Sequence, residues 1–174
     1  MMNEHELVIN KMLKEREYEK ILDLGSGKTS LGTLLKSFQK SEINAVCYPG
    51  DERKTKSIKE NCKGNYNLYE MDICKEQPKE KYDLVMCHLL LGEALKFNNT
   101  LEDMLNGILK IDAKEVCIID YFEDIDIDFK LVRKIFKSNG YNIVKEIIYK
   151  KENVEKYEKF IGKNYIGLLF EKIK

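Results

Sequence analysis

The sequence predicts an α/β fold in which a mostly parallel seven-stranded sheet lies between two layers of helices, a three-layer α/β/α sandwich. Three observations lead to this prediction. Short apolar segments alternate with helical patterns along most of the chain, which is typical of parallel strands joined by crossover helices. The first apolar segment runs through a glycine-rich turn into a helix. The last two apolar segments lack a strong helical pattern between them, which favours an antiparallel pair of strands at one edge.

Length and composition favour one domain over residues 1–174, with residues 1–20 as a helical lead-in. Hydrophobic residues make up 43% of the chain, and no apolar run approaches the ~20 residues that cross a bilayer. Lys plus Arg and Asp plus Glu both number 30, so the overall charge demands neither a nucleic-acid nor a membrane partner. We expect no membrane partner, and the absence of a secretory signal favours the cytoplasm.

The five cysteines do not form the pattern of a metal or disulfide site. Their number is odd, none are spaced as C-x-x-C, and the chain has only two histidines. Cys47, Cys87 and Cys117 lie inside apolar runs, so they are expected to be buried in a reducing compartment. We therefore predict no bound metal.

The first part of the chain predicts a helix, a strand, a turn and a second helix. Residues 4–19 carry apolar side chains among charges, as in a short helix. Residues 21–24 predict a buried strand, and residues 25–27 form a turn of small residues. Four apolar residues then follow the i, i+3, i+4, i+7 spacing of one buried helix face: Leu31, Leu34, Leu35 and Phe38.

The middle of the chain predicts two further strands with a helix between them. Residues 43–48 form an apolar segment that a Pro-Gly turn ends. Asp51 is the predicted N-cap of a helix over residues 52–62, which has a basic face. Residues 66–71 predict the third strand, and residues 75–81 a charged loop.

The remaining elements continue the alternation. Residues 82–87 predict the fourth strand, and the apolar segment that follows it is expected to be partly covered. Thr100 can cap a helix with a buried stripe of Leu101, Met104, Leu105, Ile108 and Leu109. Residues 116–120 predict a fifth strand, and a helix is predicted from Asp128 to a stop at Asn139-Gly140. Residues 143–149 and 165–170 predict the last two strands.

Three segments, in this order and spacing, resemble motifs of the class I S-adenosylmethionine-dependent methyltransferases, a Rossmann-like family. They are ILDLGSGKT at residues 21–29, EMDI at residues 70–73 and YDLVMCHLLL at residues 82–91. The resemblance covers nearly the whole chain. It implies S-adenosylmethionine as cofactor and methyl transfer to an acceptor at the carboxyl edge of the sheet.

The resemblance also implies which residues bind the cofactor. The turn of Gly25, Ser26 and Gly27 would pack against its amino-acid end, and Asp23 would bind its ammonium group directly or through water. Asp72 would accept a hydrogen bond from the adenine amino group. The flanking residues Met71 and Ile73 would touch the adenine ring, and Cys87, in the segment that resembles the motif on strand four, is a further candidate for cofactor binding.

The end of the second strand departs from the family pattern. The family has an acid there that bonds both ribose hydroxyls, but this chain has Tyr48, and the first acid is Asp51. Either the Pro-Gly turn brings Asp51 into reach of the ribose, or Tyr48 packs against the nucleoside. Asp51 can equally serve only as the cap of its helix.

Two rival nucleotide sites fail on spacing. A phosphate-binding loop, G-x-x-x-x-G-K-[ST], requires glycine where the chain has Leu22. A dinucleotide fingerprint, G-x-G-x-x-G, requires glycine where the chain has Ser30. Both patterns fit the turn less well than the methyltransferase pattern does.

His88 is the candidate for a catalytic base, because it follows the fourth strand and imidazole titrates near neutral pH. It can equally be a packed histidine at a strand end. Glu93, Asp120 and Tyr121 are weaker candidates at the same edge. Methyl transfer from a sulfonium depends largely on positioning, so a base is optional.

The sequence therefore predicts an S-adenosylmethionine-dependent methyltransferase that acts on a small molecule or on RNA. RNA could follow the basic residues of the predicted helix over 52–62, although such a run is usually a solvated face. The alternative is a non-catalytic module of the same fold that binds a partner protein or RNA. The acceptor and the oligomeric state stay open.

Overall fold

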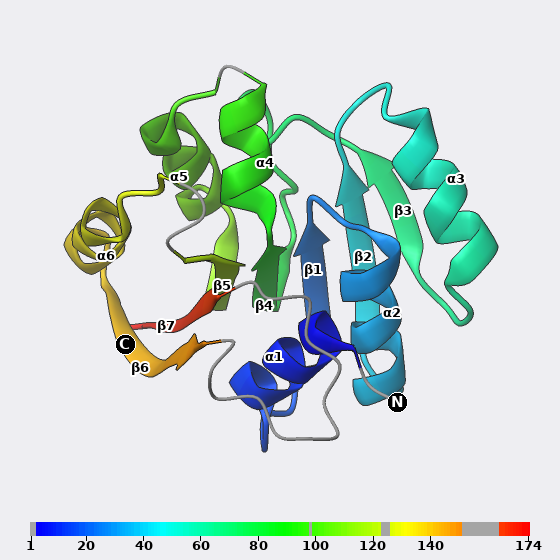
Figure 1. The fold of residues 1–174 in the computed structure, drawn as a ribbon, viewed down its shortest axis with the longest axis horizontal. Coiled ribbons are helices and arrows are strands. Elements are labelled where there is room, and N and C mark those ends of the chain that lie inside the picture. Colours follow the sequence, from blue (N-terminus) through cyan, green and yellow to red (C-terminus); the bar gives the residue numbers. More distant parts are fainter. Residues whose placement is uncertain (1–2, 98, 123–125, 151–163) are drawn as a thin grey trace.

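Seven strands form one sheet in the order β3-β2-β1-β4-β5-β7-β6 (Figure 1). The structure is a computed structural model that describes residues 3–97, 99–122, 126–150 and 164–174. All pairs from β3 to β5 are parallel, whereas β7 is antiparallel to both of its neighbours. The strands are β1 (Lys20–Leu24), β2 (Glu42–Cys47), β3 (Asn67–Glu70), β4 (Lys81–His88), β5 (Asp112–Tyr121), β6 (Tyr141–Tyr149) and β7 (Tyr165–Lys172).

In the described part of the chain, six helices cover the two faces of the sheet and give the predicted three layers (Figure 1). One apolar cluster joins the first three helices to one face, and a second joins the last three to the other. Neighbouring residues of one strand belong to opposite clusters, as Ile21 and Leu22 do, so strands buried on both faces must be apolar throughout. The helices are α1 (Glu4–Leu13), α2 (Lys28–Ser37), α3 (Glu52–Asn61), α4 (Leu90–Lys96), α5 (Leu101–Leu109) and α6 (Phe129–Ser138).

Side-chain caps fix the starts of three helices at the predicted residues. Asp51 accepts a hydrogen bond from Lys54 N, Thr100 from Asp103 N and Asp128 from Leu131 N. The parallel strands β1, β2 and β4 each lead within a few residues into a helix start, that of α2, α3 and α4 in turn. The carboxyl edge of the sheet is therefore where loops and helix N-termini converge, and this is the edge at which open α/β sheets bind ligands.

Three elements differ from the sequence prediction. The first helix ends at Leu13 instead of reaching residue 19, because Glu15 adopts a left-handed conformation with φ of 64°. The fifth strand begins at Asp112 because it pairs with β4 from its first residue. Residues 90–96 form α4, where only a covered segment was predicted.

Candidate functional site

The turn after β1, residues 25–27, packs closely against both β2 and α4. Gly25 has φ of +61°, a region that favours glycine, and a Cβ there would lie 2.6 Å from Leu90 Cδ1 of α4. Ser26 N donates to Val46 O of β2 at 2.8 Å. The turn is therefore held against β2 on one side and α4 on the other.

Asp23 lies behind this turn and is fully buried. Its Oδ2 accepts hydrogen bonds from Ser26 Oγ at 2.5 Å and from Ser30 Oγ at 2.9 Å. Its Oδ1 has no hydrogen-bond partner among the described residues. Burial raises the pKa of Asp23 to about 7, although the two hydroxyl donors and the charge of Lys54 act in the opposite direction.

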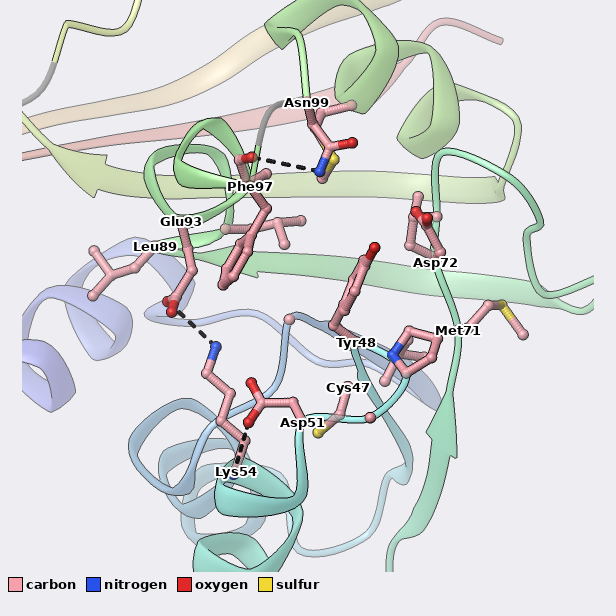
Figure 2. A pocket seen from close by; sticks show the side chains of 18 of the residues that line it. Cys47, Tyr48, Asp51, Lys54, Met71, Asp72, Leu89, Glu93, Phe97 and Asn99 are labelled. Atoms are coloured by element: carbon pink, nitrogen blue, oxygen red, sulfur yellow. Dashed lines mark hydrogen bonds and ion pairs between the residues drawn. The ribbon is translucent and has the colours of Figure 1, made fainter.

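A first cavity of about 420 Å³ opens beside the turn, at the ends of β2 and β3 and against α4 and α5 (Figure 2). Met71, Ile73 and Met104 give it apolar surface, and Asp72 lies between the first two. The Asp72 Oδ1 accepts from Cys74 N at 3.0 Å, and its Oδ2 lies 3.9 Å from Lys75 Nζ. The second segment of the resemblance, EMDI, thus forms one wall of the cavity.

Both candidates at the end of β2 line this first cavity. Tyr48 is 47% exposed, and its ring lies parallel to that of Phe97, with centroids 6.1 Å apart and planes at 8° (Figure 2). Asp51 caps α3 and also lines the cavity. The structure therefore brings both candidates to the site and leaves the ribose contact a prediction.

A second cavity of about 340 Å³ lies on the other side of the turn. It shares five residues with the first cavity: Gly25, Arg53, Lys54, Leu89 and Glu93. Gly27, the start of α2, His5 and His88 complete much of its lining. Leu89 has φ of 57°, an unusual conformation for leucine and one that often accompanies functional sites.

His88 ends β4 and is buried against His5 of α1, with ring centroids 5.2 Å apart in an edge-to-face arrangement. Burial, together with a smaller effect of the nearby His5, lowers the pKa of His88 to about 3. Its Nε2 has no hydrogen-bond partner among the described residues. At neutral pH the side chain is therefore an uncharged imidazole, which suits a hydrogen-bonding role better than proton uptake.

The neutral state of His88 should make the protein less stable in acid. Its folded pKa lies below the unfolded value of 6.5, so its contribution to stability falls as pH falls through 6.5 towards 3. At pH 5 the neutral His88 should cost the wild type about 2 kcal/mol of its free energy of unfolding relative to pH 7.5, and we expect this cost to be absent in His88→Gln. Denaturant unfolding of both proteins at pH 5 and pH 7.5 tests this, and an equal pH dependence in the two would contradict it.

The weaker base candidates have other structural partners. Asp120 is buried, and its Oδ2 accepts from Gly92 N at 3.1 Å, which caps α4. Burial raises the pKa of Asp120 to about 6. Tyr121 packs against Tyr165, with ring centroids 5.2 Å apart. Glu93 forms an ion pair with Lys54 and is the one of the three that lines both cavities.

The other predicted residues lie around the two cavities or beneath them. Cys47 lines the first cavity and Gly27 the second, whereas Ser26 and Cys87 are fully buried. Cys47, Cys87 and Cys117 are free and buried, as predicted. Lys54, Phe97 and Asn99 line the first cavity and were not predicted, because nothing in the local pattern of the sequence distinguishes them.

Residues 5–90 match the family model of the methyltransferase small domain. No curated protein matches the sequence. None of the helices in the described part of the chain is long and apolar enough to cross a membrane.

Solved structures of low sequence identity share the fold. An N-methyltransferase, NodS, from Bradyrhizobium japonicum in complex with S-adenosyl-L-homocysteine has a TM-score of 0.71 at 9% identity, over 98% of this chain and 86% of that one. A TehB-like methyltransferase from Corynebacterium glutamicum has a TM-score of 0.67 at 16% identity, over 99% and 89%. A protein from Pyrococcus horikoshii proposed to be an RNA methyltransferase has a TM-score of 0.65 at 17% identity, over 97% and 82%.

Proposed function

We propose that this chain is an S-adenosylmethionine-dependent methyltransferase. Residues 5–90 match the family model of the methyltransferase small domain, and the chain has a class I methyltransferase fold. The observation that carries the proposal is the pair of cavities that meet at Gly25. Together they offer a cavity with an apolar wall on one side of the turn and a cavity at the start of α2 on the other. This division suits a ligand with a nucleoside at one end and an amino acid at the other.

The first cavity would hold the adenosine. Its apolar wall of Met71, Ile73 and Met104 suits a flat base, and Asp72 offers a carboxylate at the rim of that wall. Tyr48 and Phe97 place two parallel rings at the same cavity, where an aromatic ring can stack on a bound base. The fit of apolar faces and one hydrogen-bond acceptor supports an adenine site.

The second cavity would hold the amino-acid end and admit the acceptor. The bound cofactor supplies an activated methyl group on its sulfonium, so the chain has chiefly to orient the acceptor and exclude water. His88 and Leu89 lie at the end of β4, beside the place where the two cavities meet. An uncharged His88 could accept a hydrogen bond from a protic acceptor and so orient it.

Cofactor binding is the first test. Titration calorimetry should detect S-adenosylmethionine and S-adenosylhomocysteine, and Gly25→Val should weaken both by tenfold or more, about 1.4 kcal/mol, because the valine side chain would enter the Leu90 contact at a left-handed φ. Gly32→Ala is the matched control, since a Cβ there meets nothing within 4 Å. No heat and no thermal shift at millimolar ligand would refute the proposal.

Tyr48 in place of the family's acid supports a second candidate, a non-catalytic module that binds a partner protein or RNA. Labelled cofactor and a panel of small molecules and RNAs would separate the two, because only an enzyme transfers the label. On the basic face of α3, Lys54 pairs with Glu93 and Lys56 pairs with Glu60. These ion pairs reduce the net positive charge of that face. An RNA acceptor would still require binding that falls steeply with salt.

A further inference from the structure

An ion pair crosses the junction of the two cavities. Lys54 Nζ of α3 lies 3.3 Å from Glu93 Oε2 of α4, and Figure 2 shows the two side chains reaching toward each other from the two helices. Both residues line both cavities. A ligand that fills both cavities must therefore pass beside this pair or replace it.

The pair is of a kind that opens readily. The side chains of Lys54 and Glu93 are 25% and 42% exposed, and solvent-exposed ion pairs add little to stability because water screens them. Glu93 N donates to Leu89 O at 3.4 Å, a long bond in the first turn of a short helix. A ligand that offers each partner a new opposite charge can replace the bond between them at little cost.

The second cavity presents a ligand with charges of both signs. Among the described residues that line it, Glu93 is the one with a carboxylate. The nearby Asp23 does not reach the cavity, because it is fully buried behind the turn and its Oδ2 accepts hydrogen bonds from two hydroxyls. Lys54 stands within electrostatic range of Asp23 and faces the same space. A zwitterion, with a carboxylate and an ammonium group on one carbon, matches such a divided pair.

We propose that the Lys54–Glu93 pair is the docking point of the cofactor's amino-acid end. On binding, the pair opens, Lys54 takes the cofactor's carboxylate and Glu93 takes its ammonium group. This inference rests on the proposed function, and it assigns to Glu93 a contact that the sequence pattern assigns to Asp23. Asp23 then acts from behind, by holding the turn through Ser26 and Ser30.

The experiment uses two nucleosides that differ only in the zwitterion. S-adenosylhomocysteine carries the amino-acid end, and 5′-methylthioadenosine lacks it while it keeps the adenosine and the thioether. Calorimetry is expected to show that Lys54→Met and Glu93→Gln each weaken S-adenosylhomocysteine by tenfold or more. The affinity of each variant for 5′-methylthioadenosine should stay within twofold of the wild type.

The chain offers a matched control on the same helix. Lys56 and Glu60 of α3 form an exposed ion pair of 3.9 Å away from both cavities. Lys56→Met and Glu60→Gln make the same two changes of charge, and both ligands should bind these variants as they bind the wild type. Equal thermal unfolding of all four variants would show that no difference comes from a loss of folding.

Three results would overturn the inference. Equal weakening of both nucleosides would mean that the pair only positions α3 and α4. Tighter binding of both would mean that the pair obstructs the site. Unchanged affinity for S-adenosylhomocysteine would place its amino-acid end elsewhere. A wild type that binds neither nucleoside is a different result, since it refutes the proposed function itself.

Discussion

Gly107→Ala is expected to lower the free energy of unfolding by about 2–3 kcal/mol and the melting temperature by roughly 5–10 °C. A Cβ at this position of α5 would lie 2.4 Å from Ile73 O and 3.0 Å from both Ile73 C and Ile73 Cγ2. The nearest atoms belong to backbone, so they cannot rotate away. Alanine in a helix interior ordinarily stabilises by about 0.5–1 kcal/mol over glycine, and here the clash outweighs that gain.

Gly167→Ala provides the comparison that isolates the cause. A Cβ there would lie 2.5 Å from Met12 Sδ, nearly as close, but a methionine side chain is flexible and can move. We expect a smaller loss of stability for Gly167→Ala than for Gly107→Ala, measured by denaturant unfolding of both. Because Ile73 lines the first cavity, Gly107→Ala should also weaken nucleoside binding. Equal stability of Gly107→Ala and the wild type would contradict the argument.

The order of elements was predictable because local signals determine most of it. The caps Asp51 and Thr100 and the helix start at Asp128 follow from residue type and position, and the structure confirms each. The antiparallel edge followed from the weak pattern between the last two strands, and β6 and β7 do pair in this way. These features depend on few residues close together in sequence.

The features that the sequence did not predict depend on partners far along the chain. The helix α4 has an N-cap, Leu89, with no side-chain hydrogen bond, and its backbone is capped instead by Asp120 of β5, 28 residues away. The Lys54–Glu93 pair joins two helices across the site. A pattern within one segment carries no information on such contacts.

Asp23 gives the other large expected effect, because one substitution there should raise the free energy of unfolding at neutral pH. Its carboxyl is fully buried, and its folded pKa of about 7 lies above the unfolded value of 3.8. The native state then holds the proton more tightly than the unfolded state does. The contribution of Asp23 to stability is therefore present below pH 3.8 and is lost as pH rises towards 7, by roughly 4 kcal/mol in total.

Asp23→Asn should remove that loss, since the amide has nearly the same shape and does not titrate. Relative to the wild type, we expect its free energy of unfolding to rise by roughly 3–4 kcal/mol between pH 4 and pH 8, measured by denaturant unfolding across that range. Its affinity for S-adenosylhomocysteine should change less than that of Glu93→Gln, because Asp23 supports the turn from behind and the amide oxygen can still accept from Ser26 and Ser30. If the difference in stability between variant and wild type did not change with pH, the pKa of Asp23 would be the same in the folded and unfolded states, which would contradict the argument.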